Sequence, residues 1–244
     1  MKYILITGAT GGIGKALVED LLVNGFGVCA VGRSEEKLRE TFAGKDNICF
    51  FENDLSTEES IVGLIKQVTN KVGPISGMVH CAGFDKLSPL FLNKRKDTEA
   101  LLNIHVLAAM DLCKMLAKKG NATDDCSIIL ISSMAAHEGA RGQTAYATAK
   151  GALEGFLGPA ASELADRNIR LNIVILGATN SEMTMSYLEK MDEDQKQKFE
   201  ASYPFGLAKP KDIVGMISFL LSNKANWITG QKFIVDGGHS VRRV

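Results

Sequence analysis

The stretch Ile4-Leu5-Ile6-Thr7-Gly8-Ala9-Thr10-Gly11-Gly12-Ile13-Gly14 decides the fold. It joins a short apolar run to a glycine-rich turn, and apolar residues then recur at helical spacing at Leu17, Val18, Leu21 and Leu22. Glycine lets a backbone turn tightly and approach a pyrophosphate, and the start of a helix offers unpaired N–H groups to an anion. The stretch therefore predicts a strand, a phosphate-binding turn and a helix.

Further apolar runs along the chain alternate with segments of helical spacing. Including the first run, they span residues 2–7, 27–32, 48–52, 75–81, 127–132, 170–176 and 232–235. These runs are apolar on both faces, which is typical of parallel strands covered by helices on each side. The pattern predicts an α/β fold: a single Rossmann-type domain over residues 1–244, with a doubly wound parallel sheet of about seven strands flanked by helices on both faces.

Composition excludes several classes of protein. The 244 residues include 28 Lys and Arg against 28 Asp and Glu, so no excess of positive charge favours nucleic acid or an acidic membrane. The five cysteines form no CxxC pair and the four histidines no HxxxH pair, which argues against a disulfide framework and a metal site. No apolar run approaches the roughly 18 residues of a membrane span, and we expect a cytoplasmic protein.

Three segments have local features of their own. Residues 120–125 (GNATDD) are typical of a surface loop, and Ser56 with Glu59 predicts a capped helix start. Residues 180–203 are helix-prone and follow the sixth strand, where an excursion would cover a site beyond the carboxyl ends of the strands. We expect a substrate flap there, with an ordinary surface helical pair as the open alternative.

The glycine spacing and the end of the second strand bear on the cofactor. The glycines satisfy both TGxxxGxG (Gly8, Gly12, Gly14) and GxxGxxG (Gly8, Gly11, Gly14). The second strand ends at Gly32-Arg33, where an NAD site usually presents an acidic residue. Because a guanidinium pairs with a 2′-phosphate, the sequence predicts NADP(H) rather than NAD(H). The alternative is that Arg33 is a solvated surface charge beside Glu35 and Glu36.

Tyr146 and Lys150 are four residues apart on a predicted helix, and therefore on one face of it. A neighbouring ammonium favours the phenolate and so lowers the pKa of a phenol, which suits it to general acid–base catalysis. Ser133 closes the fifth strand, where its hydroxyl would polarise a carbonyl. A surface pair of Tyr and Lys is the alternative interpretation.

With these residues in place, the sequence resembles the compact, single-domain branch of the short-chain dehydrogenase/reductase family over nearly its whole length. The resemblance is carried by the TGATGGIG turn and the Ser133, Tyr146 and Lys150 set, and also by Asp54, Cys81-Ala82-Gly83, Asn103, Asn172 and the ending Ile228-Thr229-Gly230-Gln231 with Val235-Asp236-Gly237-Gly238. Length favours TGxxxGxG, because the branch with GxxGxxG carries an added substrate domain.

The resemblance implies a role for each site residue. Tyr146 would donate the proton, Lys150 would hold the nicotinamide ribose and lower the pKa of Tyr146, Ser133 would orient the carbonyl, and Asn103 would hold the water of a proton relay. Asp54 would bind the adenine amino group, and Ser181 the carboxamide. The implied cofactor-binding residues are Gly8, Thr10, Gly12, Ile13, Gly14, Arg33, Asp54, Leu55, Cys81, Ala82, Gly83, Tyr146, Lys150, Gly177, Thr179 and Ser181.

The chain departs from the family pattern at two strand ends. The family usually has two asparagines where this chain has His80-Cys81, and these amides brace the strand ends near the cofactor. The family proline after the sixth strand is replaced by Leu176, which restores an N–H group and frees the backbone angle φ. We expect altered cofactor binding at the first position and a looser pocket edge at the second. His137 follows Ser133 and would either contact substrate or lie as a surface imidazole.

The resemblance implies an NADP(H)-dependent reductase that converts a small-molecule ketone to a secondary alcohol. It is strongest to 3-oxoacyl-[acyl-carrier-protein] reductases, in the glycine turn, in Arg167 and in the ending, which makes a carrier-bound acyl thioester a candidate substrate. Asp124 and Asp125 have the wrong charge for an acidic carrier, so sugar, steroid and small-ketone reduction stay open, as does a cofactor-binding regulator without turnover. The helices at 97–119 and 144–167 are apolar over more than one stripe, and the resemblance implies that they pair in a homotetramer or homodimer.

Overall fold

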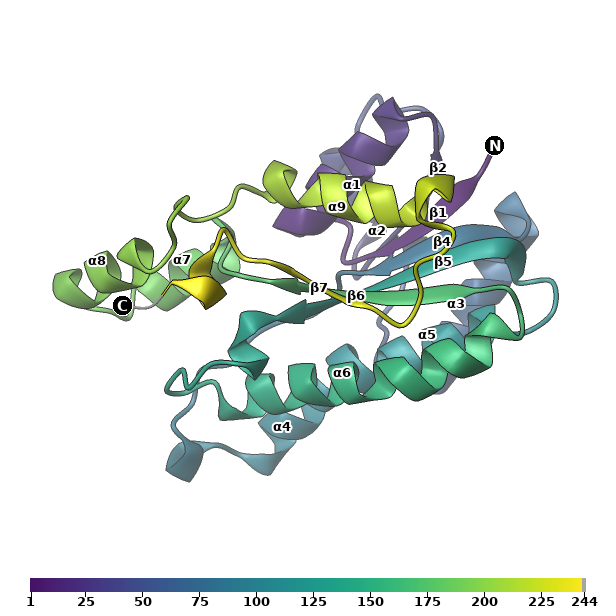
Figure 1. Ribbon diagram of the computed structural model, residues 1–244. Coiled ribbons are helices and arrows are strands. Elements are labelled where there is room, and N and C mark those ends of the chain that lie inside the picture. Colours follow the sequence, from purple (N-terminus) through teal and green to yellow (C-terminus); the bar gives the residue numbers. More distant parts are fainter. Residues whose placement is uncertain (243–244) are drawn as a thin grey trace.

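The structure is a computed structural model that describes residues 1–242, apart from the side chains at positions 182 and 183. In this part of the chain, seven parallel strands form one sheet in the order β3-β2-β1-β4-β5-β6-β7 (Figure 1). The strands are β1 (Tyr3–Thr7), β2 (Gly27–Gly32), β3 (Ile48–Glu52), β4 (Ile75–His80), β5 (Ala122–Ser133), β6 (Arg170–Leu176) and β7 (Lys232–Val235). The predicted doubly wound α/β fold is confirmed.

Helices cover both faces of the sheet. On one face Leu17 and Ile217 are fully buried in one core. On the other face Leu64 and Leu112 are buried in a second core. The helices are α1 (Gly12–Val23), α2 (Glu35–Thr41), α3 (Glu58–Val72), α4 (Arg95–Leu102), α5 (Ala108–Leu116), α6 (Thr144–Ala165), α7 (Glu182–Leu188), α8 (Glu193–Ala201) and α9 (Pro210–Leu221). Among the described residues, no helix has the length and apolar character needed to cross a bilayer.

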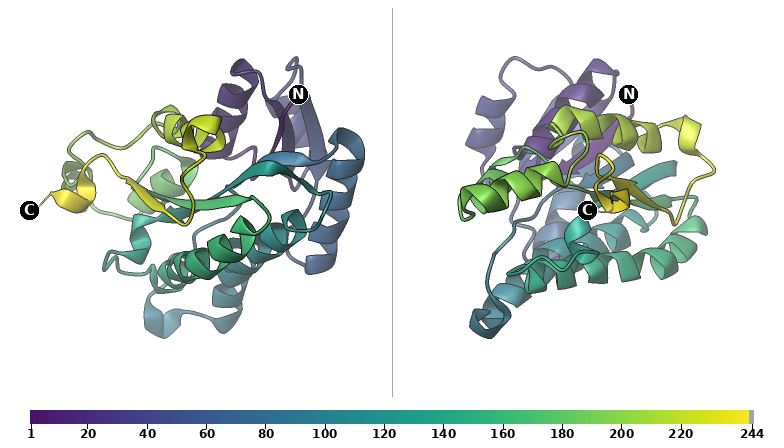
Figure 2. Two further views of the ribbon diagram at one scale, coloured as in Figure 1. Left: turned by 45° about the vertical axis from the view of Figure 1, so that its right-hand side comes forward. Right: turned by 60° about the vertical axis from the view of Figure 1, so that its left-hand side comes forward.

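The order of the strands creates a switch point between β1 and β4. From there the chain builds β2 and β3 on one side, and β5, β6 and β7 on the other. Because all strands are parallel, the carboxyl ends of β1, β4 and β5 meet at one edge of the sheet, where open α/β sheets bind ligands. Figures 1 and 2 show α7, α8 and the C-terminal segment beyond this edge.

Three predicted boundaries are wrong. The expected loop at 120–125 is largely strand, because β5 begins at Ala122, which pairs with Ile75 across a register shift. Pairing with β4 outweighs the turn-forming composition of this segment. The predicted helix at 97–119 begins at Arg95, ends at Leu116 and contains a π turn (Asn103–Leu107) between α4 and α5. Thr57, not Ser56, caps α3 and accepts a hydrogen bond from the Ser60 N–H (3.2 Å).

Candidate active site

The glycine-rich turn joins the end of β1 to α1 at the carboxyl edge. Gly8 has a φ of +64°, and a Cβ there would come 2.8 Å from the backbone of Ala82. A Cβ at Gly14 would overlap the carbonyl oxygen of Gly8. Gly11 caps α1 without a side-chain hydrogen bond, so no side chain at this position competes for the first amides of the helix. The turn requires glycine at positions 8 and 14 and presents the positive end of the helix dipole to an anion.

We expect Gly14→Ala to lower the free energy of unfolding by about 3 kcal/mol, because the new methyl group overlaps the Gly8 carbonyl in a closely packed turn. Gly63→Ala in α3 is the matched control, since a Cβ there meets no atom within 4 Å. That control should gain about 0.5–1 kcal/mol from helix propensity. Urea unfolding of both variants checks the difference, and equal stabilities would contradict the close approach.

His80 joins the ends of β1 and β4 to the π turn. Its Nδ1 lies 2.8 Å from the Thr7 Oγ1, and its Nε2 lies 2.9 Å from the Ile104 carbonyl oxygen. Because a carbonyl only accepts, Nε2 carries the proton and Nδ1 accepts from the Thr7 hydroxyl. The Thr7 oxygen in turn accepts from the Ala82 N–H (3.2 Å), and burial lowers the pKa of His80 to about 4. The imidazole therefore braces the strand ends despite the missing asparagine amides.

A hollow of about 370 Å³ lies beside the turn, lined by Thr10, Arg33, Ser34 and Lys37. Two cationic side chains and two hydroxyl groups there are suited to a phosphate group. Of these residues, the sequence prediction includes Thr10 and Arg33 and misses Ser34 and Lys37, although Lys37 is four residues after Arg33. Asp54 lies exposed after β3, where its carboxylate accepts a hydrogen bond from the Ser56 hydroxyl (3.1 Å).

The structure brings Ser133, Tyr146 and Lys150 together at the carboxyl end of β5. Tyr146 and Lys150 are buried on one face of α6, and the Lys150 Nζ lies 5.5 Å from the centroid of the Tyr146 ring. Lys150 donates to the Ile131 carbonyl oxygen (2.8 Å), and the side chain of Ser133 lowers the pKa of Tyr146. A phenol, an ammonium and a hydroxyl group therefore converge at one place.

The acid–base properties of this group differ from the prediction that Lys150 lowers the pKa of Tyr146. Burial raises the pKa of Tyr146, the charge of Asp85 raises it further, and the hydrogen bond to Ser133 lowers it only in part. Burial also lowers the pKa of Lys150 to about 8. Desolvation outweighs the attraction of the ammonium for the phenolate in this structure. Tyr146 is therefore a phenol at neutral pH, which suits a proton donor.

Asn103, the predicted holder of a relay water, lies exposed to solvent at the start of the π turn. His105, two residues later, is the side chain that contacts Tyr146: their rings pack edge to face with centroids 5.4 Å apart. The π turn widens the helix locally, so regular helical spacing does not predict which residue faces α6. The structure thus places His105 beside Tyr146, and the role of Asn103 in a proton relay stays a prediction.

The other predicted residues line the same edge. A Cβ at Gly177 would lie 2.8 Å from the Asp236 Cα, and Ser181 caps α7 and lies 3.8 Å from a Cβ built at Gly12. Thr179 forms an isolated parallel bridge with Ala208. The remaining predicted positions are Ile13 in the first turn of α1, the buried Leu55 after β3, and Cys81, Ala82 and Gly83 directly after β4.

The loop between Ser133 and Tyr146 is held by two networks that the sequence did not predict. In the first, the buried Glu154 accepts from the Ser132 hydroxyl (2.8 Å) and lies 3.0 Å from the His137 Nε2 and 3.3 Å from the Lys232 Nζ. Glu154 is one helical turn beyond Lys150 on α6. His137 thus contacts Glu154, and the network fixes the start of the loop to α6 and β7.

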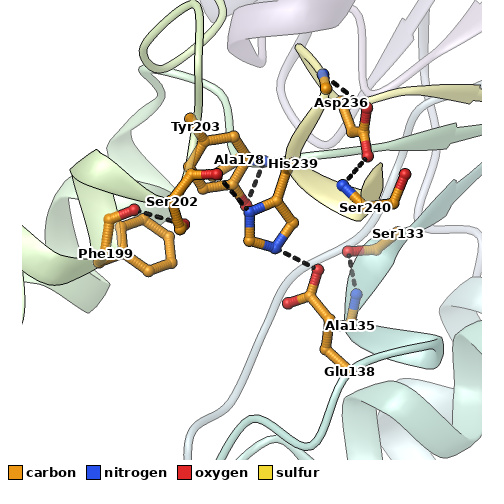
Figure 3. Close-up of polar contacts among 11 residues, drawn as sticks. Ser133, Ala135, Glu138, Ala178, Phe199, Ser202, Tyr203, Asp236, His239 and Ser240 are labelled. Atoms are coloured by element: carbon orange, nitrogen blue, oxygen red, sulfur yellow. Dashed lines mark hydrogen bonds and ion pairs between the residues drawn. The ribbon is translucent and has the colours of Figure 1, made fainter. Parts of the chain in front are cut away.

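In the second network, shown in Figure 3, the C-terminal segment joins this loop to the end of the helical pair α7–α8. The His239 Nε2 lies 2.9 Å from the Glu138 Oε1, and its ring stacks on Tyr203 with centroids 4.2 Å apart. The Tyr203 hydroxyl accepts from the Ala178 N–H (3.2 Å) after β6. His239 therefore connects the loop after β5, the end of the helical pair α7–α8 and the end of β6.

The family model described as Enoyl-(Acyl carrier protein) reductase matches residues 8–240. A match over this span, together with the strand order and the Ser133, Tyr146 and Lys150 group, settles the classification. The chain belongs to the short-chain dehydrogenase/reductase family. Members of this family catalyse oxidation and reduction, and the chain is an oxidoreductase of the same kind.

Similar members of the short-chain dehydrogenase/reductase family cover nearly the whole chain. The chain is 31% identical to a 3-oxoacyl-[acyl-carrier-protein] reductase FabG of Thermotoga maritima and 29% identical to Carbonyl reductase family member 4 of Xenopus tropicalis, with 97% of each chain covered. A diacetyl reductase of Staphylococcus epidermidis is 30% identical, with 97% of this chain and 98% of the relative covered. A solved structure, ElxO with NADP bound, has a TM-score of 0.87 at 27% identity and 99% coverage of both chains.

Proposed function

We propose that the chain is an NADP(H)-dependent reductase that converts a ketone to a secondary alcohol, with Tyr146 as the proton donor. The proposal rests on one observation above all: a phenol and an ammonium lie buried together on α6, beside the hydroxyl group that ends β5. The experiment that tests it is ketone-dependent oxidation of NADPH by the purified chain, over small ketones, sugar ketones, steroids and 3-oxoacyl thioesters. Binding of NADPH without turnover on any of them would instead indicate a cofactor-binding regulator.

The residues at the carboxyl edge fit a nicotinamide cofactor. The absent side chain at Gly12 leaves the backbone open, since a Cβ there would have its nearest neighbour, Pro210, at 3.6 Å. The α1 amides would hold the pyrophosphate, and Arg33 and Lys37 would hold a 2′-phosphate in the hollow beside the turn. Asp54 and Leu55 would lie at the adenine, Cys81, Ala82 and Gly83 along the middle of the cofactor, and Gly177, Thr179 and Ser181 at its carboxamide. The NADP-bound relative structure supports this choice of cofactor.

Three side chains would bind and protonate the substrate oxygen. A reduced nicotinamide supplies a hydride when bound. Ser133 donates a hydrogen bond that orients the carbonyl group, and Tyr146 gives up its proton as negative charge develops on that oxygen. The ammonium of Lys150 then favours the phenolate left on Tyr146. Because burial raises the pKa of Tyr146, the proton is held until the substrate oxygen accepts it.

We expect kcat/KM for ketone reduction to fall as the pH rises through about 8. In that range Lys150 loses its charge, because its pKa is about 8, while Tyr146 keeps its proton because its pKa is raised. The loss of the cation removes the group that stabilises the phenolate. Steady-state rates at saturating NADPH, with circular dichroism at each pH as the folding control, check this profile. A rate that stays level through this range would contradict the role of Lys150.

The chain also presents a surface suited to self-association. Leu107 and Met110 are 50% and 40% exposed on the helix that precedes β5, and glycines at 151, 155 and 158 leave open space along α6. Exposed apolar groups beside small residues allow two helices to approach closely. We expect a dimer or tetramer by light scattering, and a monomer at micromolar concentration would contradict the prediction.

A further inference from the structure

Two buried acceptor atoms beside Tyr146 have no hydrogen-bond partner among the described residues: the Asp85 Oδ1 and the His105 Nδ1. His105 is only 2% exposed, and its Nε2 donates to the Phe84 carbonyl oxygen (2.8 Å), which leaves Nδ1 as an acceptor. Burial lowers the pKa of His105 to about 2, so the ring stays neutral. Buried polar atoms normally have a hydrogen-bond partner, because a buried polar atom without a hydrogen bond costs free energy. Since both atoms are acceptors, the missing partner is a donor.

Asp85 lies in the loop after β4, two residues beyond Gly83. Its second carboxylate oxygen receives a long contact from the Gln143 Nε2 (3.5 Å), at the start of α6, and the backbone N–H of Lys86 also hydrogen-bonds to the carboxylate. Its charge raises the pKa of Tyr146 and also that of Tyr187 on α7. The charge of Asp85 therefore acts on Tyr146 of α6 and on Tyr187 of α7, and its side chain contacts Gln143, three residues before Tyr146.

A second carboxylate belongs to Glu138, in the loop after β5. Glu138, paired with His239, also raises the pKa of Tyr187 and of Tyr203. The charges of Asp85 and Glu138 thus both act on Tyr187 of α7. An unbranched acyl chain would take water from these groups and offer them no hydrogen bond in return. A substrate with polar donors would satisfy them.

We propose that Asp85 accepts a hydrogen bond from a hydroxyl or ammonium group of the substrate, so that the preferred ketones carry a hydrogen-bond donor next to the carbonyl group that is reduced. This substrate class rests on the proposed function, because it presupposes that Tyr146 protonates a ketone. It narrows the candidates from the sequence to donor-bearing small ketones and sugar-like ketones, and disfavours 3-oxoacyl thioesters. Asp85 becomes a specificity-determining residue.

The test compares two isomeric ketones that differ in one donor. 1-Hydroxy-2-butanone can donate a hydrogen bond beside its carbonyl group, whereas 1-methoxy-2-propanone has the same atoms and cannot. We expect the parent to prefer the hydroxyketone by about tenfold or more in kcat/KM, because a site with an unpaired polar group rejects an analogue that lacks its partner. Asp85→Ala should remove this preference by lowering kcat/KM for the hydroxyketone alone. Asp124→Ala, at an exposed position of β5, is the matched control and should keep it.

Two further arms complete the design. Comparing kcat/KM for aminoacetone and hydroxyacetone distinguishes an ammonium donor from a hydroxyl donor. Asp85→Asn should retain the preference for a hydroxyl group through its amide oxygen, and it should weaken binding of an ammonium group. Titration of each variant with NADPH confirms that it folds and binds the cofactor. Loss of NADPH affinity in Asp85→Ala with the ketone preference intact would assign Asp85 to the cofactor and overturn the proposal.

Two other outcomes also overturn it. If Asp85→Ala slows both isomers equally, Asp85 only positions Tyr146 or Lys150. If the parent reduces the methoxyketone or an acetoacetyl thioester at least as well as the hydroxyketone, then the substrate class is wrong while the proposed function stands. If none of the ketones tested supports oxidation of NADPH by the parent, the proposed function itself fails, and the proposed substrate class fails with it.

Discussion

Tyr146→Phe should lower kcat for ketone reduction by about 10²–10⁴-fold, the usual contribution of a positioned general acid. The variant removes a single oxygen atom and keeps the ring that packs against His105 at 5.4 Å between centroids. Removing a buried phenol whose raised pKa holds its proton deprives the developing alkoxide of its donor. The affinity for NADPH should change little, and steady-state rates with a cofactor titration separate the two effects.

Tyr3→Phe is the matched control for this prediction. Tyr3 begins β1 at the opposite end of the strand from the glycine turn, and its loss of a hydroxyl group should leave kcat unchanged. A Tyr146→Phe variant as fast as Tyr3→Phe on every accepted ketone would remove Tyr146 from the mechanism. Ser133 or a bound water would then have to supply the proton.

The double variant Arg33→Ala with Lys37→Ala should weaken NADPH binding by about 10²-fold or more and leave NADH binding unchanged. Both cations line the hollow beside the glycine turn, and each hydrogen bond to a charged phosphate contributes about 1.5–3 kcal/mol. Without them, the cofactor loses the cationic partners of its 2′-phosphate, while the contacts that NADPH and NADH share are kept. Isothermal titration with the two cofactors measures the change in preference.

Arg39→Ala provides the control for charge alone. Arg39 pairs with Glu35 on the same helix and does not line the hollow, so its loss should affect neither cofactor. If the double variant lost NADPH and NADH affinity equally, the hollow would bind a part of the cofactor common to both. If neither affinity changed, Arg33 would be the surface charge that the sequence left as an alternative.

Much of the fold could be predicted from the sequence because buried parallel strands leave a strong local signal. The runs at 27–32, 48–52, 170–176 and 232–235 coincide with β2, β3, β6 and β7, since each run is rich in apolar residues and ends at or just before a glycine or polar residue. The glycine turn is equally local: Gly8 and Gly14 are required by contacts within seven residues and with the end of β4.

The parts that escaped prediction depend on contacts between distant segments. The extension of β5 to Ala122 needs its pairing with β4, and the π turn that brings His105 beside Tyr146 leaves no pattern in the sequence. The raised pKa of Tyr146 follows from burial and from Asp85, sixty-one positions earlier in the chain, whereas spacing alone shows only that Lys150 is near. Local patterns thus indicate which groups are present, and packing decides their protonation.

Transfer of deuterium from NADPH labelled at the hydride-donating carbon of the nicotinamide tests the central claim most directly. Parent and Tyr146→Phe proteins are incubated with labelled NADPH and an accepted ketone, and the alcohol is analysed by mass spectrometry. The account predicts one deuterium on the carbinol carbon of the parent's product and almost no alcohol from the variant. Unlabelled alcohol, or labelled alcohol formed equally fast by both proteins, would contradict it.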